Sequence, residues 1–289
     1  MNNRVNEIEK VRNNAKNTII LLIIIFAIGI VAYAWMQNFY TVIVLVVVLL
    51  FLISIGSKKT ANYRYAFRDF NLRYPAELAF KKEVDIDWTG MDLLKVEESH
   101  VVPFANLFSS ENMVTIELDD IKIERSDVIT QLKYTLDGRN ALIRTLFNGR
   151  YDIMYFPNDL ANYISIRDTN ISGTDLEKYY KEAPATTKVL TEDSDFNKLF
   201  DVYTVIESDV EKILTDEVRT ILKNYKTYHT GVVYFGFLNN EIHLAVSQVE
   251  TTKEPSVYKS VEKLDFSEEK KDYENMIDLA RYFNGHETK

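Results

Sequence analysis

The stretch from Asn17 to Ser57, NTIILLIIIFAIGIVAYAWMQNFYTVIVLVVVLLFLISIGS, contains no charged residue. As one helix it would be roughly 60 Å long, at a rise of about 1.5 Å per residue. The hydrocarbon core of a bilayer is about 30 Å thick, so two crossings fit this length and one does not. Polarity returns at Gln37-Asn38. We therefore predict a transmembrane hairpin over residues 18–56, with helices at Thr18–Ala34 and Phe39–Gly56.

The sequence allows two other interpretations of this stretch. It could be a buried hairpin of a soluble protein, although two adjacent charge-free runs of this length are unusual there. It could also be a signal peptide, because Ala32-Tyr33-Ala34 has the small residues of a cleavage site. The length of the first run and the second run behind it favour the hairpin. Aromatic residues at Tyr33, Trp35 and Tyr40 suit a membrane interface at the turn.

Positive charges predict the orientation of the hairpin. Four of them precede the first span, and none lies in the connecting turn. A basic collar follows the second span, formed by Lys58, Lys59, Arg64, Arg68 and Arg73. The positive-inside rule then places both flanks in the cytoplasm. We expect a multi-pass protein of the cell membrane, with the bilayer around residues 18–56 and anionic lipid headgroups against the collar.

Charge is distributed unevenly over the 289 residues. Residues 57–82 carry seven Lys/Arg and two Asp/Glu, whereas residues 83–289 carry 23 and 39, a net charge of −16. We therefore divide the chain into a cytosolic tail (1–17), the hairpin (18–56), a basic juxtamembrane helix (57–83) and an acidic cytosolic domain (84–289). The whole chain has a net charge of −9, which argues against nucleic acid as a partner. The absence of cysteine excludes disulfides and thiolate ligands.

The juxtamembrane segment has an aromatic stripe at helical spacing: Tyr63, Phe67, Phe70 and Tyr74. We expect this helix to continue the second span as far as Pro75, where a kink or a restart should follow. The aromatic stripe could fold back onto its own domain. Alternatively, it could pair with the same stripe of a second copy and form a homodimer.

The sequence of the acidic domain predicts an α+β fold with antiparallel strands and flanking helices. Predicted strands are 114–118, 121–124, 128–136, 141–156, 162–166, 231–238 and 241–249. Turn signals stand between them at Asp119-Asp120, Asp137-Gly138 and Asn239-Asn240. A helix with Ser267 as N-cap is predicted from Ser267 to Phe283.

The segment FNKLFDVYTVIESDVEKILTDEVRTIL, Phe196 to Leu222, combines a strand with two helices. Ser208 and Glu211 have the spacing of a capping box, and Thr215 can cap a second helix. The core motif predicted to point into the domain is formed by Phe196, Phe200, Tyr203, Ile213 and Leu214. Each of these features has a structural reason, so this segment is not expected to carry chemistry.

The same segment resembles a bacterial family described as domain of unknown function 3137. The similarity lies in an F-x-x-x-F-x-V-Y core followed by a short helix ending in I-L-T, here residues 196–203 and 213–215. FANLF at 104–108, LFNGRYDI at 146–153 and the paired N-terminal spans are also similar to that family. A family glycine expected after Asp120 is not evident. The resemblance implies an architecture and no catalytic residue.

Candidates for chemistry are few. The histidines, His100, His229, His243 and His286, lack metal-site spacing, and His243 alternates in a strand so that we expect it on an outer face. Acidic pairs occur at 85/87, 119/120 and 193/195, where turns and caps explain them better than metal does. The sequence therefore predicts no cofactor and no metal site, and catalytic residues stay unknown.

Two functional hypotheses remain. The leading one is a membrane-tethered cytosolic module that binds an unidentified protein partner at the inner face of the cell membrane and is not an enzyme. The alternative is an unrecognised hydrolase or transferase that uses Asp/Glu and a divalent metal. Clustered carboxylates in a pocket would favour the enzyme, whereas an exposed groove above a filled core would favour the binding module.

Overall fold

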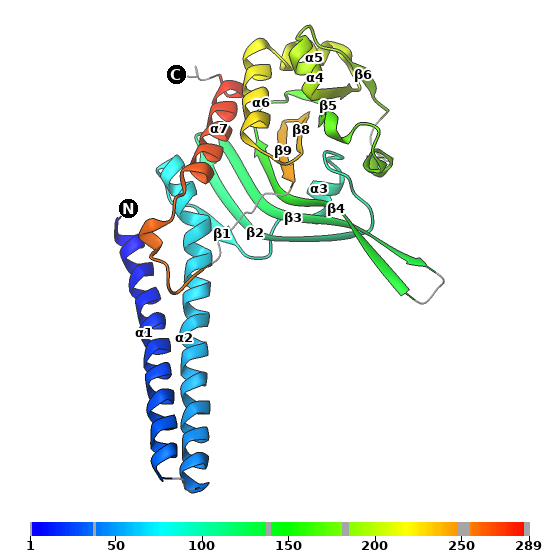
Figure 1. The fold of residues 1–289 in the computed structure, drawn as a ribbon. Helices are drawn as coiled ribbons and strands as arrows, with labels where there is room; N and C mark the ends of the chain where they lie inside the picture. The colour runs from blue at the N-terminus through cyan, green and yellow to red at the C-terminus, as the bar shows by residue number, and fades with distance from the viewer. Residues whose placement is uncertain (1, 37–38, 137–139, 181–184, 248–254, 286–289) are drawn as a thin grey trace. The chain divides into compact units, whose positions relative to one another are not determined.

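The computed structural model describes residues 2–36, 39–136, 140–180, 185–247 and 255–285. The chain divides into two compact units. Unit 1 contains residues 1–74 and 252–267, and unit 2 contains residues 75–251 and 268–289. Figure 1 labels the elements of both units. The predicted turns at 37–38 and 137–138 and the histidine at 286 lie outside the described residues.

Unit 1 is built on two long antiparallel helices (Figure 1). Helix α1 spans Asn2–Met36, and helix α2 begins at Phe39 and ends at Phe80, beyond the boundary of the unit. Both are long and apolar enough to span a membrane, and their most apolar 18-residue windows have mean hydropathies of 2.7 and 2.4. Only 6% of the most apolar window of each helix is buried. A core helix of a soluble protein is mostly buried, so these helices do not have the burial of a soluble core.

Helix α2 passes through Pro75 and ends at Phe80, so of the two predicted alternatives, a kink or a restart, the restart does not occur. Proline lacks an N–H and disfavours the helical conformation of the residue before it. Packing on both sides outweighs this cost. Phe70 stacks on Tyr74 with ring centroids 4.7 Å apart, and Ala76 and Phe80 are buried after the proline.

Unit 2 is built on an antiparallel sheet, as predicted. Nine strands among the described residues have the order β1-β2-β3-β4-β9-β8-β5-β7-β6. The strands are β1 (Asp85–Asp87), β2 (Leu107–Leu118), β3 (Ile121–Leu136), β4 (Asn140–Tyr155), β5 (Ala161–Asp168), β6 (Thr187–Val189), β7 (Phe200–Thr204), β8 (Val233–Asn239) and β9 (Glu241–Ser247). The segments predicted as 121–124 and 128–136 are one continuous strand, β3.

Two predicted turns owe their shape to residues that tolerate a positive φ. Asp119 has φ 53° between β2 and β3, and Asn239 has φ 49° between β8 and β9. Asparagine and aspartate adopt this left-handed conformation more readily than other residues with side chains. The two hairpins were therefore visible in the sequence.

Helices and short 3-10 turns cover the sheet. They are α3 (Leu93–Glu97), η1 (Thr169–Ile171), η2 (Asp175–Tyr180), α4 (Ser194–Leu199), α5 (Glu207–Ile213), α6 (Asp216–Tyr228) and α7 (Ser267–Phe283). A further 3-10 turn, η3 (Val261–Lys263), belongs to unit 1. Arg150 and Tyr151 are neighbours on β4 and point to opposite faces. Arg150 meets Asp272 of α7, and Tyr151 meets Ser99 beside α3, so α7 and α3 cover opposite faces.

Capping differs from the prediction at one of the helices in the 196–222 segment. Thr215 caps α6, because its hydroxyl accepts a hydrogen bond from the Val218 N–H. Ser208 does not cap α5, which begins one residue earlier, at Glu207. The Thr204 hydroxyl instead accepts a hydrogen bond from the Ile206 N–H at 3.1 Å. The predicted capping box at α5 is therefore wrong. At α4, Asp193 is the N-cap residue, and its side chain accepts hydrogen bonds from the backbone N–H groups of Asp195 and Phe196.

Candidate functional site

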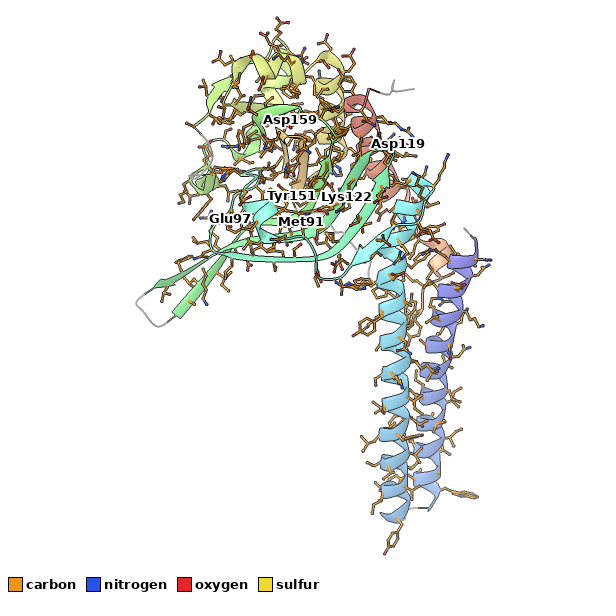
Figure 2. The ribbon with its side chains drawn as sticks, turned by 180° about the vertical axis from the view of Figure 1, so that it is seen from behind. Met91, Glu97, Asp119, Lys122, Tyr151 and Asp159 are labelled. Carbon is orange, nitrogen blue, oxygen red and sulfur yellow. The ribbon has the colours of Figure 1, made fainter. Side chains whose placement is uncertain are left out.

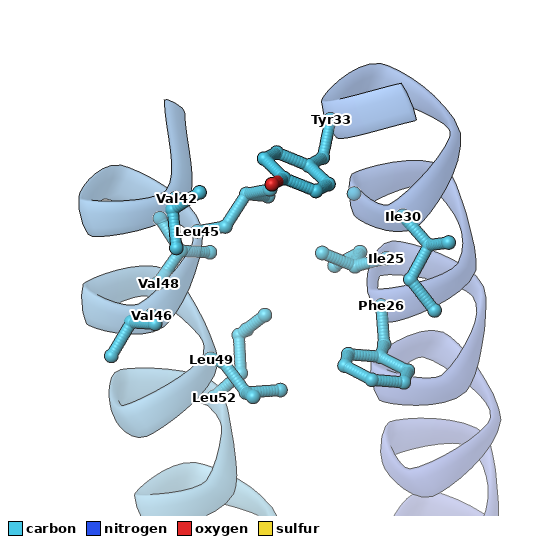
Figure 3. A pocket seen from close by; sticks show the side chains of 11 residues that line it. Ile25, Phe26, Ile30, Tyr33, Val42, Leu45, Val46, Val48, Leu49 and Leu52 are labelled. Carbon is cyan, nitrogen blue, oxygen red and sulfur yellow. The ribbon is translucent and has the colours of Figure 1, made fainter. Parts of the chain in front are cut away.

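A groove lies between the apolar parts of α1 and α2. Its volume is about 340 Å³, and side chains of both helices face one another across it (Figure 3). Its lining is formed by Ile25, Phe26, Gly29, Ile30, Tyr33, Val42, Leu45, Val46, Val48, Leu49 and Leu52. The Tyr33 hydroxyl is the polar side-chain group in this set. The groove can therefore hold apolar groups, and it offers no acid, base or metal ligand.

Two glycines bring α1 and α2 close together. A Cβ atom at Gly29 would lie 2.6 Å from Leu45, and one at Gly56 would lie 2.6 Å from Leu22. Each glycine thus leaves room for a leucine of the other helix. Small residues at a helix interface are the usual means of close packing in a membrane, where apolar burial gives no preference between helix and lipid.

The collar residues lie at increasing distances from the end of the predicted span. Because α2 is continuous, the rise of about 1.5 Å per residue places Lys58 and Lys59 within about 5 Å of Gly56 along the axis. Arg64 lies about 12 Å from it, and Arg73 about 25 Å. Arg73 also pairs with Asp69 at 3.2 Å. The collar charge nearest to the span therefore comes from its first residues.

The aromatic stripe of α2 is buried within unit 1. Tyr63, Phe67 and Phe70 are at most 3% exposed and pack with Ala15 of α1 and with Phe266. Burial raises the pKa of Tyr63 to about 12. The stripe thus packs against segments of its own chain, and a second copy could use it only by displacing them.

Polar contacts join α1 to residues 255–266 beside this stripe. Arg12 Nη1 donates to the Val257 carbonyl at 2.7 Å, and the Val261 N–H donates to Glu9 at 3.1 Å. Hydrogen bonds from Arg12 lower the pKa of Glu9, which burial alone would raise. These bonds fix residues 255–266 to the part of α1 that precedes its apolar run.

In unit 2, a buried cluster of two arginines and two aspartates lies between the sheet and α7. Arg125 contacts Asp152 at 2.6 Å and Asp272 at 2.7 Å, and Arg150 contacts Asp272 at 3.0 Å. His229 lies 2.9 Å from the same aspartate. Burial by itself would raise the pKa of Asp272, but the charges of the two arginines outweigh it and lower the pKa. We call these four charged residues the Arg–Asp cluster.

The charges of the Arg–Asp cluster balance one another, since two guanidinium groups face two carboxylates. The side chains of all four are at most 7% exposed. Such a cluster holds α7 against β3 and β4, and its side chains are almost completely buried. Arg125 and Asp272 stand 147 positions apart in the chain, so no local spacing could have revealed this contact.

On the opposite face of the sheet, a chain of hydrogen bonds crosses the core. Ser99 Oγ lies 2.7 Å from the Tyr151 hydroxyl, which lies 2.9 Å from His243 Nδ1, and His243 Nε2 lies 2.9 Å from Glu241. Figure 2 labels Tyr151 together with Met91, which belongs to the same apolar cluster. The Ser99 hydroxyl also donates to the Val96 carbonyl, and Ser99 is 2% exposed. Its burial rules out a role as an accessible nucleophile.

The prediction that His243 lies on an outer face is wrong, because this residue is 1% exposed. Strand β9 is an interior strand between β4 and β8, and both faces of the sheet are covered here. Alternation along such a strand separates two buried faces rather than a buried face and a solvated one.

Two of the three acidic pairs have structural partners. Asp87 accepts hydrogen bonds from Thr89, and Asp193 caps α4 and pairs with Lys223 at 2.6 Å. These bonds lower the pKa of Asp193 to about 2, with the Lys223 bond contributing most. Within residues 2–36, 39–136, 140–180, 185–247 and 255–285, no group of three His, Asp or Glu side chains could hold a metal ion.

Most of the predicted core motif lies inside unit 2. Phe196 and Leu214 are fully buried, and Phe200 and Ile213 are at most 6% exposed. Tyr203 is half-buried, and its ring lies 4.4 Å from the Arg167 guanidinium. It stands on the other face of β7 from Phe200 because the two residues are three positions apart on a strand. The prediction that Tyr203 points into the core of the domain stays a prediction, since this residue is only partly buried.

Comparison with known proteins identifies part of the chain. Residues 145–284 match the family model described as "Protein of unknown function (DUF3137)". No match to a curated protein is found. A solved structure, that of the mycobacterial trehalose monomycolate transport factor A, TtfA, is similar to 74% of this chain and 94% of that chain, with 10% identity and a TM-score of 0.41. A similarity of that size carries no inference about activity. Residues 145–284, which include the Phe196–Leu222 segment, are therefore a domain of the DUF3137 family.

Proposed function

We propose that this protein is a membrane-tethered module that holds its DUF3137 domain at the cytoplasmic face of the cell membrane, where the domain binds a protein partner. One observation supports the proposed membrane anchor: many apolar side chains of α1 and α2 point outward. Ile28 is 62% exposed and Val31 is 70% exposed. Such a surface is stable in lipid and costly in water.

The contacts of residues 255–266 support a retained first span rather than a cleaved signal peptide. Glu9 and Arg12 precede the apolar run and bond to Val261 and Val257. Cleavage after Ala34 would remove both side chains and leave these backbone groups without them. The same bonds require the tail of α1 and residues 255–266 to lie on one side of the membrane.

Orientation rests on charge. Each basic residue near an anionic leaflet contributes about 1 kcal/mol, and the effect fades over a Debye length of about 8 Å. Lys58 and Lys59 lie within that range of the predicted span, whereas Arg64, at about 12 Å, lies beyond it. The acidic domain should be repelled by the same surface, so the collar contacts the headgroups while the domain stands away from them.

Cysteine accessibility tests the topology, because the chain has no cysteine of its own. Trp35→Cys and Leu190→Cys each introduce one thiol at a well exposed position, 90% and 75% exposed before substitution. In intact cells, a membrane-impermeant maleimide should label position 35 and should reach position 190 only after lysis. Labelling at position 190 in intact cells would reject the cytoplasmic assignment.

Partner binding is tested by purifying the intact protein in mild detergent and identifying the proteins that accompany it. A stoichiometric partner should be present and should be lost when residues 84–289 are deleted. A preparation that contains only this chain, as a monomer or a homodimer, would argue against a separate partner.

A further inference from the structure

A second groove lies within unit 2, between the end of α2 and α7. Its volume is about 410 Å³. Phe80, Leu118 and Ile277 form its apolar floor, and each keeps only 6–7% of its surface exposed. We call this feature the α7 groove. Its lining lies outside the charge-free apolar spans of the membrane anchor.

The lining of the α7 groove follows one side of α7 over several turns. The groove is lined by Lys270, Glu274, Ile277 and Arg281, which recur at helical spacing and form one face of α7. Lys270 and Arg281 are eleven residues apart, which corresponds to about 16 Å along the helix. An extended chain of about five residues spans that length, at about 3.3 Å per residue. The shape therefore favours a peptide segment over a single small anion.

Basic residues predominate around the groove. Lys81, Lys270, Lys271 and Arg281 line it, against Glu274 and Asp278. Lys270 pairs with Glu274 at 2.8 Å. Lys81, Lys271 and Arg281 make no ion pair with any residue that the structure describes. Residues 83–289 have a strongly negative net charge. The three unpaired cations of the groove, two in this segment and Lys81 just before it, therefore stand out.

Lys81 stands in a conformation that favours glycine. Its φ is 56°, and its N–H donates to the Glu77 carbonyl at the end of α2. Glycine is the usual residue at such a helix end, and a residue with a side chain is strained there. Lysine at this position places a cation at the rim of the groove where glycine would place none. Strain of this kind is often found at binding sites.

We propose that the α7 groove binds an extended acidic segment of the protein partner, with its carboxylates on Lys81, Lys271 and Arg281 and an apolar side chain on the floor. This inference rests on the proposed function as a binding module and names its surface. Charge-assisted hydrogen bonds to carboxylates would supply orientation, and charges at the rim would make association faster at low salt than at high salt.

The test compares two triple variants of the full-length protein in mild detergent. Lys81→Gln, Lys271→Gln and Arg281→Gln together remove the unpaired cations of the groove. Lys178→Gln, Lys198→Gln and Lys212→Gln remove three exposed cations that have their own ion pairs elsewhere on the domain, and so change the net charge equally. We expect the groove variant to retain about tenfold less partner than the control variant. Thermal melts should show both variants folded.

A photo-crosslinking amino acid at position 271, and at position 198 as its control, identifies what lies in the groove. Crosslinks at 271 should join a partner peptide that contains Asp or Glu, and crosslinks at 198 should not. Equal partner retention by the two triple variants would overturn the inference while leaving the proposed function intact. So would a crosslinked peptide without acidic residues, or crosslinks only to lipid or to a second copy. If the wild-type protein has no partner at all, the proposed function itself fails.

Discussion

The helical hairpin and the sheet domain place charged and apolar groups in opposite ways. In α1 and α2, apolar side chains such as Ile28 and Val31 point outward, and the predicted spans contain no charge. In the sheet domain, Arg125, Arg150 and Asp272 are buried. In the proposed membrane-spanning arrangement, the difference follows from the surroundings. Lipid accepts apolar surface on the outside of a helix, whereas a protein core accepts charges only where they pair.

The largest expected effect comes from unbalancing the Arg–Asp cluster. Asp272→Asn removes the carboxylate that Arg125 and Arg150 share and leaves two buried guanidinium groups with one carboxylate. We expect a loss of about 3–5 kcal/mol in the free energy of unfolding. Urea denaturation of the intact protein in detergent, followed by tyrosine fluorescence, measures it. Asp216→Asn at an 89% exposed side chain serves as the control and should change little.

The same substitution predicts a dependence on pH. Folding lowers the pKa of Asp272, so its contribution to stability is complete above the ordinary carboxyl pKa of about 3.9 and is lost as the pH falls below it. The gap in stability between the wild type and Asp272→Asn should therefore narrow below about pH 4. A gap that stays constant down to pH 3 would contradict the assigned protonation of this aspartate.

The second effect concerns the apolar core of the sheet domain. Leu214 is fully buried, whereas Leu190 is 75% exposed. Leu214→Ala should lower the free energy of unfolding by about 2–5 kcal/mol through lost burial and a cavity. Leu190→Ala should leave it almost unchanged. Thermal melts of the two variants decide the matter, and equal midpoints would mean that the Phe196–Leu222 segment does not pack as the structure has it.

Local signals in the sequence were sufficient for some elements of this fold. The charge-free run predicted both long helices, and Asn239 and Asp119 marked two hairpins at positive φ. Thr215 and Asp193 were recognisable as caps. In each case the deciding interaction lies within a few residues of the signal. Such interactions can be predicted from spacing and residue type alone.

Other features depend on contacts between distant segments, and spacing could not show them. Asp272 meets Arg125 and Arg150 only because α7 returns to the sheet. His243 lies in the core because the sheet is covered on both faces, which alternation within one strand cannot reveal. The helix through Pro75 is maintained by packing on either side, against the local preference. The α7 groove is likewise formed by residues of three elements, so its cations were not singled out in the sequence.

A third, smaller effect should arise from the hydrogen-bonded chain on the α3 side of the sheet. Tyr151→Phe keeps the ring and removes the hydroxyl that lies between Ser99 and His243. Because both partners are buried, we expect a cost of about 1–3 kcal/mol in the free energy of unfolding. Tyr258→Phe, at a residue that is 62% exposed, is the matched control. If the two variants melt alike, this chain of hydrogen bonds contributes nothing measurable to the core.

The smallest expected effect is the difference in stability loss between substitutions at the two predicted helix caps, Thr215 and Ser208. Thr215 accepts a hydrogen bond from the Val218 N–H and lies 2.6 Å from the Tyr282 hydroxyl, whereas Ser208 lies exposed inside α5. Thr215→Ala should therefore lower the free energy of unfolding by about 1 kcal/mol, and Ser208→Ala should change it by less than about 0.5 kcal/mol. Both variants lose one hydroxyl within the same segment, so denaturation midpoints can be compared directly. A larger loss for Ser208→Ala would restore the capping box that the sequence predicted and would shift the start of α5. A difference in the expected direction would show that Thr215 caps α6 as the structure has it.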